Sequence, residues 1–202
     1  MRRQHIIKQS GGLLPAGYTQ LEYIESTGTQ WIKTNITGVN QDWSYVIDIM
    51  PLSTGLCGLH GIYGTKDNSR IAALIGHTTG RIDYVCGNTG YKQTTTALPR
   101  NIRYTIYDYK TKYTINNVDY AKQYANITTQ ENLMLLSFQV DYDSTNNGHY
   151  GRLYHATVYN DNNVLVLDAY PALRDSDSRP GLYDTVNNVF YTNAGTGEFL
   201  YA

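Results

Sequence analysis

Apolar and polar side chains alternate with a period of two along much of the chain. Residues 43–49 place Trp, Tyr or Ile at every second position, which is the pattern of a strand with one buried and one solvated face. Further strand-like runs cover 29–37, 56–64, 70–76, 81–86, 91–97, 102–107 and 113–115. Turn sequences such as KDNS, HTTG and GNTG separate several of them. The pattern predicts a series of short antiparallel strands.

The C-terminal third predicts two hairpins, whose strands cover 153–159 with 164–170 and 182–184 with 189–192. The first turn holds Asp161, Asn162 and Asn163, which are residue types that favour turns. Residues 133–140 are continuously apolar, as in a strand covered on both faces, and only 128–135 has any helical character. About a dozen strands at a spacing of roughly 8–12 residues indicate an all-β, antiparallel two-sheet sandwich or jelly roll.

Residues 1–14 differ from the rest of the chain. They are basic and too short to hold a core, so we expect an N-terminal arm followed by one domain over 15–202. Two interpretations of the arm stay open. It is either a frayed tail or an anchor in which Arg2, Arg3 and Lys8 dock the chain on a partner.

The charge balance and hydropathy exclude two kinds of partner. Lys and Arg number 16 against 17 Asp and Glu, so the chain has no overall basic field to gather nucleic acid. No apolar run approaches the roughly 18 residues that cross a bilayer. Ile6 and Ile7 are followed at once by Lys8 and Gln9, which completes neither a secretory nor a twin-arginine signal. We expect no nucleic acid, no membrane, and, for any role outside a cell, release by another route such as lysis.

The polar composition favours recognition over metabolism. The chain holds 20 Tyr, 23 Thr and 17 Asn, which suit pleated surfaces and turns. Sugars stack their apolar faces on aromatic rings, while Asn and Asp bind their hydroxyls. The glycan-binding candidates are the tyrosines in or beside predicted loops: Tyr63, Tyr91, Tyr142 and Tyr150. The alternative is that these side chains only cover strands, with their hydroxyls in water.

Metal and cysteine chemistry has few candidates. Asp141, Asp143 and Asn146 offer the hard oxygen ligands that Ca²⁺ prefers, but the same residues also suit a plain Asx-rich turn. Zinc has no Cys/His cluster to use, so we expect no cofactor apart from this Ca²⁺ candidate. Cys57 and Cys86 form either one disulfide or two buried thiols.

Two segments resemble a known family. They are LPAGYTQLEYIESTGTQWIKTNI at residues 14–36 and GRLYHATVYNDNNVLVLDAYPALRDSDSRPGLYDTVNNVFYTNAGTGEF at residues 151–199. Together they are similar to the concanavalin A-like, LamG-like jelly-roll proteins of gut-bacterial phages and prophages. The resemblance implies an all-β jelly-roll sandwich in which Gln30–Ile32 and Gly197–Leu200 help to close the fold. The middle of the chain, 40–150, carries no family motif.

The resemblance implies a non-enzymatic phage virion structural protein, such as a capsid decoration, head fibre or tail component, docked through its N-terminal arm. Its partners would be other virion proteins and a host surface glycan, with a trimer as the favoured homo-oligomer. It would be located in the virion after assembly in the host cytoplasm. The alternative is a free-standing, extracellular carbohydrate-binding lectin-like module.

A glycoside hydrolase is the third and least favoured function. Glucanases of this fold class carry paired carboxylates on one strand, and retaining enzymes hold them roughly 5–5.5 Å apart. The four glutamates, which are Glu22, Glu25, Glu131 and Glu198, each lack another acidic residue two positions away. The alternate pair Asp141 and Asp143 reads as a loop. The chain also lacks a G-x-S-x-G elbow and glycine-rich phosphate motifs, so we expect no enzyme.

Overall fold

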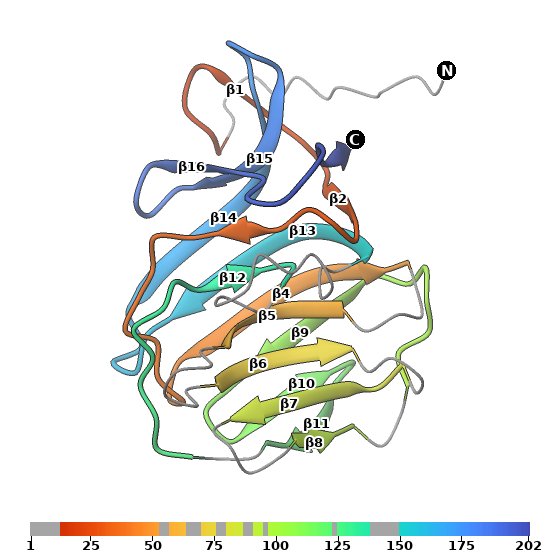
Figure 1. Ribbon diagram of the computed structural model, residues 1–202, viewed down its shortest axis with the longest axis vertical. Coiled ribbons are helices and arrows are strands. Elements are labelled where there is room, and N and C mark those ends of the chain that lie inside the picture. Colours follow the sequence, from red (N-terminus) through yellow and green to blue (C-terminus); the bar gives the residue numbers. More distant parts are fainter. Residues whose placement is uncertain are drawn as a thin grey trace.

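Two antiparallel β-sheets pack against each other in this protein (Figure 1). The computed structural model describes residues 13–52, 57–63, 70–75, 80–86, 91–94, 97–122, 125–137 and 150–202. These residues form 17 strands and no helix, and thus no helix that could cross a membrane. The all-β antiparallel sandwich predicted from the sequence is confirmed.

The larger sheet has eleven strands. Its main path runs through β11 (Val118–Ala121), β10 (Lys112–Ile115), β9 (Tyr104–Asp108), β4 (Ser44–Pro51), β13 (Tyr150–Tyr159), β14 (Leu165–Arg174), β15 (Arg179–Asp184) and β16 (Val189–Thr192). Three short strands extend it: β1 (Tyr18–Gln20) pairs with β14, and β2 (Ile24–Thr27) pairs with both β13 and β17 (Leu200–Tyr201).

The smaller sheet has six strands and covers the inner face of the larger one. Its order is β3 (Ile32–Lys33), β12 (Met134–Leu135), β5 (Cys57–Tyr63), β6 (Arg70–Ile75), β7 (Ile82–Cys86) and β8 (Tyr91–Gln93). Five of these strands come from the middle of the chain, where the sequence carries no family motif. The central segment therefore supplies most of one wall of the sandwich.

The alternation of β4 builds the core. Tyr45, Ile47 and Ile49 are almost fully buried, while the residues between them stay partly exposed on the outer face. Register places Ile47 between Ile106 of β9 and Ala156 of β13, so apolar side chains form a continuous inner layer. Burial of one such large side chain contributes about 1.5–3 kcal/mol, and this layer holds the two sheets together.

The two ends of the sandwich domain lie side by side, as the resemblance implied. Leu200 of β17 pairs with Glu25 of β2. The backbone N–H of Ala194 donates to Trp31 O at 2.9 Å, and Trp31 N–H donates to Asn193 Oδ1 at 3.1 Å. The segments 14–36 and 151–199 therefore close the fold by pairing with each other.

Asp184 explains the closing sequence motif in structural terms. Its buried carboxylate accepts the backbone N–H groups of Asp168 at 3.2 Å and Val186 at 3.0 Å. It also accepts Asn187 Nδ2–H at 2.6 Å, and Asn188 takes a left-handed conformation with φ of 55°. The motif shapes the β15–β16 turn.

Several strand predictions differ from the structure. The predicted strand 29–37 pairs only over Ile32–Lys33, and β1 and β2 were not predicted. The predicted strand 133–140 is buried through residue 137 but pairs only over Met134–Leu135, because Leu136 takes a positive φ of 61° and ends the ladder. Residues 138–140 lie outside the described part of the chain. Strand β11 was not predicted, because three of its four residues are exposed and it has no buried apolar phase.

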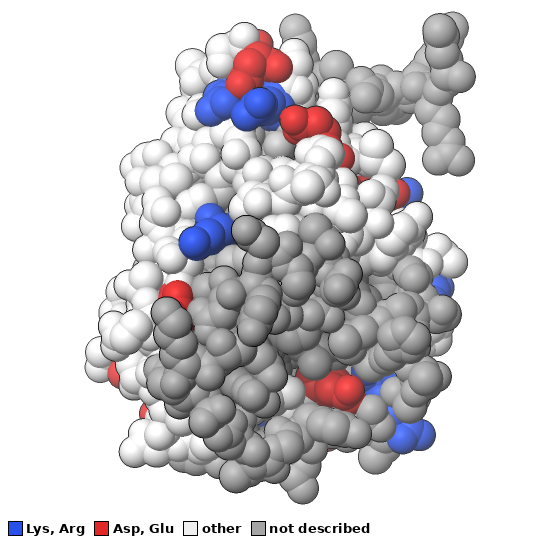
Figure 2. All heavy atoms as spheres, in the orientation of Figure 1, with Lys and Arg blue, Asp and Glu red and all other residues white. Residues whose placement is uncertain are grey.

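Charges of both signs are interspersed on the face that Figure 2 shows, among the residues that are described there. One group of both signs lies at the β14–β15 turn, where Arg174 forms a bidentate pair with Asp177 at 3.0 and 2.6 Å. This described surface has no extended basic patch.

Cys86 is a free thiol, so the disulfide interpretation is wrong. On β6, Cys57 lies opposite Ile75 and Cys86 lies opposite Ile71, four residues apart along the strand. The Cys86 Sγ–H group donates to Ala125 O at 3.5 Å. Burial raises the pKa of the Cys86 thiol. This effect outweighs the hydrogen bond to Ala125, which lowers the pKa.

Cys86 should therefore react slowly with thiol reagents. In a Cys57→Ser variant at pH 8, we expect alkylation of the folded protein to be at least about tenfold slower than that of the urea-unfolded chain, because the thiolate is disfavoured and shielded. Mass spectrometry of timed samples measures both rates. Equal rates would contradict the buried position.

Gly195 should not tolerate a side chain. A Cβ at this position would overlap Thr29 O and the Trp31 ring. We expect Gly195→Ala to lower the free energy of unfolding by about 1–3 kcal/mol in urea titrations, because neither neighbour can move freely. Glu198→Ala, an exposed change in the same segment, is the control and should stay within about 0.5 kcal/mol of the wild type. A stable Gly195→Ala variant would refute the close approach.

Candidate functional site

The fold separates the tyrosines predicted to bind glycans. Tyr150 begins β13 beside the end of β4, since the next residue, Gly151, pairs with Pro51. Tyr63 ends β5, three residues beyond His60, whose ring stacks on Tyr45 near the start of β4. Tyr150 and Tyr63 therefore lie at opposite ends of the sandwich.

Tyr91 begins β8 opposite Val85, at the same end of the smaller sheet as Tyr63. The remaining predicted site residues lie outside the described part of the chain: Arg2, Arg3, Lys8, Asp141, Tyr142, Asp143 and Asn146. Within the described residues, no group of three His, Cys, Asp or Glu side chains could hold a metal ion. The Ca²⁺ loop and the docking arm stay predictions.

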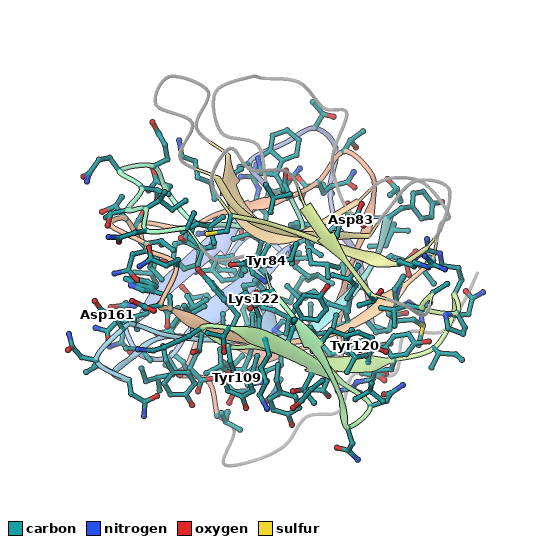
Figure 3. All side chains as sticks on the ribbon, turned by 90° about the horizontal axis from the view of Figure 1, so that it is seen from below. Asp83, Tyr84, Tyr109, Tyr120, Lys122 and Asp161 are labelled. Carbon is teal, nitrogen blue, oxygen red and sulfur yellow. The ribbon has the colours of Figure 1, made fainter. Side chains whose placement is uncertain are left out.

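Two other tyrosines form an exposed aromatic pair on the outer face of the larger sheet. Tyr107, on β9, and Tyr109, just after it, are 39% and 40% exposed. Their ring planes differ by only 10°, and the ring centroids are 6.2 Å apart. Figure 3 shows Tyr109 on the outer side of the larger sheet. We call Tyr107 and Tyr109 the aromatic platform.

Polar side chains flank one side of the platform. Tyr107 lies opposite Thr114 of β10, whose hydroxyl donates to Asp119 at 2.5 Å. Lys112 Nζ donates to the other oxygen of Asp119 at 2.6 Å. The hydrogen bonds from Lys112 and Thr114 lower the pKa of Asp119, so this carboxylate is charged at neutral pH.

The other side of the platform meets an Asn- and Asp-rich turn. Lys110, next to Tyr109, donates to the backbone oxygen of Asp161 at 3.5 Å. Asn40 Nδ2–H donates to the Asp161 carboxylate at 3.1 Å. The platform is therefore bordered on both sides by charged and amide groups that can bind hydroxyls.

The backbone at Tyr109 is fixed from within the protein. Its N–H donates to Lys112 O at 2.7 Å, and its carbonyl oxygen accepts a hydrogen bond from Lys122 Nζ at 2.5 Å. The Lys122 side chain is fully buried, and Figure 3 shows it between the two sheets. The exposed ring of Tyr109 is therefore carried by a backbone anchored to the interior.

Lys122 belongs to a buried charged cluster centred on Asp108. Lys122 Nζ donates to Asp108 Oδ1, and His60 Nε2 lies 3.0 Å from Asp108 Oδ2, although it is poorly aligned for a hydrogen bond. All three side chains are at most 1% exposed. The Lys122 ammonium also lies 4.0 Å from the centre of the Tyr84 ring. We call Asp108, Lys122 and His60 the buried triad.

Opposing effects set the charge of Asp108. Burial disfavours the carboxylate, but the charge of Lys122 and the contact with His60 outweigh it and hold the pKa of Asp108 below its usual value. Burial also raises the pKa of Tyr45 and Tyr84 well above the usual value, with a further contribution from the Asp108 charge. These two phenols remain neutral.

Neither the buried triad nor the aromatic platform was predicted from the sequence. Asp108 follows Tyr104 and Ile106 in the buried phase of β9, so its inward position could have been read from the alternation. Tyr107 lies in the opposite, solvated phase of the same strand. The glycan candidates were chosen from predicted loops, and this excluded a site on a strand.

A His–Asp pair lies on the same outer face. His155 Nε2 lies 2.6 Å from Asp168 Oδ1, and the His155 ring stacks on Tyr170 at 4.3 Å. The hydroxyls of Tyr170 and Thr185 donate to Asp168 rather than to the histidine. A catalytic nucleophile instead needs its hydroxyl bonded to the base, and the described residues show no such bond here.

A hollow of about 360 Å³ opens at the β14–β15 turn. Asp177, Arg179, Glu198 and Tyr201 are among the residues that line it. Asp177 is already paired with Arg174 at 2.6 Å.

Known proteins resemble this chain in structure but not in sequence. No protein-family model matches the chain, and no curated protein sequence matches it. Among solved structures, a candidate carbohydrate-binding protein from Bacteroides ovatus superposes with a TM-score of 0.63 at 14% identity, over 91% of this chain and 60% of that one. Domains LG4–5 of the mouse laminin α1 chain superpose with a TM-score of 0.52 at 12% identity, over 69% of this chain and 41% of that one.

These neighbours are concanavalin A-like and LamG-like folds, which confirms the fold that the resemblance implied. At this identity the likeness shows the fold alone. The chain spans about 60% of the length of the Bacteroides protein.

Lys122 should be essential for stability. We expect Lys122→Met to lower the free energy of unfolding by about 3–5 kcal/mol in urea titrations, because the Asp108 carboxylate stays buried without a compensating cation.

Lys112→Met is the matched control, because Lys112 forms a similarly close pair with Asp119 but both side chains are about half exposed. It should leave the unfolding midpoint nearly unchanged. If both variants lost the same stability, the special role of the buried triad would be refuted.

Proposed function

We propose that this protein is a carbohydrate-binding, lectin-like module without catalytic activity. The observation that carries the proposal is the aromatic platform: two nearly parallel tyrosine rings, each about two-fifths exposed, at the end of β9. Tyrosine rings that are exposed on the outer face of a sheet contribute little to the hydrophobic core. They can instead contact the apolar face of a sugar ring.

The platform has the chemistry that sugar binding requires. Aromatic rings contact the C–H faces of a pyranose, and polar groups at the border bind its hydroxyls and set its orientation. Asp119 can accept hydroxyl hydrogens, and Lys112 can donate to hydroxyl oxygens.

The structural neighbours support this proposal over the virion role. The Bacteroides structure is of a candidate carbohydrate-binding protein, and the second neighbour consists of laminin LG domains. Neither likeness points to a capsid, fibre or tail. The virion role, its trimer and its location remain predictions from sequence, and the arm residues Arg2, Arg3 and Lys8 on which docking depends lie outside the described chain.

Three of the described carboxylates are held by cationic side chains, which favours binding over hydrolysis. Glu25 is paired with Arg152 at 2.8 Å, and Asp48 is paired with Arg103 at 2.8 and 2.6 Å. Asp119 is held by Lys112 and Thr114. A glycosidase needs one carboxyl group kept protonated opposite a second one, and charge-paired carboxylates do not meet that need.

A glycan array followed by calorimetry tests the proposal. We expect the protein to bind a defined set of glycans, and Tyr107→Ala or Tyr109→Ala to weaken that binding at least about tenfold, because each removes a stacking surface. Tyr107→Phe and Tyr109→Phe keep the ring and should retain most of the affinity.

Tyr150→Ala is the matched control, because Tyr150 is 41% exposed but begins β13 at the end of β4. It should bind as the wild type does. If Tyr150→Ala lost binding while the platform variants bound normally, the glycan site would instead lie at the end of the sandwich where β13 begins. A folded protein that binds no glycan would refute the function.

A further inference from the structure

The buried triad places a primary amine against a carboxyl group in a position that bulk solvent does not reach. Lys122 Nζ donates to Asp108 Oδ1 and to Tyr109 O, and the Tyr84 ring lies against it. The side chains of Lys122 and Asp108 are 0% and 1% exposed. Neither the glycan-binding proposal nor the fold requires a reactive amine at this position.

The surroundings favour reaction once a proton moves. The resting pair is ionic, since Lys122 holds the pKa of Asp108 down. Transfer of one proton along the Nζ–H···Oδ1 hydrogen bond gives a neutral amine beside a neutral carboxylic acid. Exclusion of water lowers the cost of that neutral pair relative to the charged one, because two buried charges lose their hydration.

We infer that Lys122 and Asp108 condense to form an intramolecular amide, a covalent cross-link between the end of β11 and the end of β9. The lone pair of Lys122 Nζ attacks Cγ of the protonated Asp108 side chain and forms a tetrahedral intermediate. The nitrogen then loses a proton, the bond from Cγ to one carboxyl oxygen breaks, and one water molecule leaves. The product is an Nζ–Cγ amide, and no oxidant or further reactant is needed.

His60 is positioned to stabilise the tetrahedral intermediate. Its Nε2 lies 3.0 Å from Asp108 Oδ2, the oxygen that does not accept the Lys122 hydrogen bond. Nζ gives its second proton to Oδ1, the oxygen to which it is already hydrogen-bonded, and Oδ1 leaves as water with both protons. His60 Nε2–H faces Oδ2, which becomes the amide oxygen, and can stabilise the negative charge that forms there in the tetrahedral intermediate.

The same chain holds a control pair without this environment. Lys112 Nζ donates to Asp119 at 2.6 Å, but the two side chains are 47% and 54% exposed. Water solvates both charges there, and no histidine contact to Asp119 is present among the described residues. Lys112 and Asp119 should therefore remain an ordinary ion pair.

Intact-mass spectrometry of the purified full-length protein tests the cross-link. The wild type should weigh about 18 Da less than its sequence mass, the mass of one water molecule. Lys122→Arg should show its full sequence mass, and Lys112→Arg should show the same loss as the wild type. Trypsin should fail to cleave after Lys122, and fragmentation should join the peptides that carry Lys122 and Asp108.

Two further observations separate this cross-link from other losses of water. The mass deficit must survive hydroxylamine, which reopens succinimides. His60→Gln should slow the condensation, giving a mixture of both masses in freshly purified protein. A wild-type protein at its full sequence mass, or a link at any other pair of residues, would overturn the inference.

Discussion

The carboxylate of Asp108 lies inside an otherwise apolar layer, and the surrounding structure compensates for that charge. Lys122 and His60 reach it from different sheets, the first from the end of β11 and the second from β5. A buried carboxylate is tolerated only with such partners, since the loss of hydration costs several kcal/mol. Asp108 therefore requires the two sheets to meet in one specific arrangement at this end.

This requirement links the interior to the outer face. Lys122 contacts Asp108 and the carbonyl oxygen of Tyr109, which is the next residue along the chain. Tyr109 carries half of the aromatic platform, so the backbone under the exposed ring is held by the same side chain that contacts the buried Asp108. A rigid backbone reduces the entropy lost when a ligand binds, which is an advantage for a shallow, sugar-binding surface.

The alternation of apolar and polar residues predicted the sandwich well. It failed where a polar residue is buried or an apolar residue leaves the strand. The apolar phase of β4 and the turns of the closing motif predicted their strands closely, because burial and turn chemistry act there in the same direction. Leu136 broke a predicted strand because its positive φ cannot be read from an apolar residue type. The contact of Asp108 with Lys122 joins β9 to the residue after β11, and sequence spacing gives no measure of such tertiary contacts. The platform was missed because strand residues were assigned to structure in advance.

A crystal structure at high resolution tests the central claim most directly, because it shows where the Lys122 side chain lies. The account predicts Lys122 between the sheets, within bonding distance of Asp108 and in contact with the carbonyl oxygen of Tyr109, with His60 on the opposite side of the carboxyl group. A Lys122 side chain turned out to solvent, with water molecules around Asp108, would contradict the account.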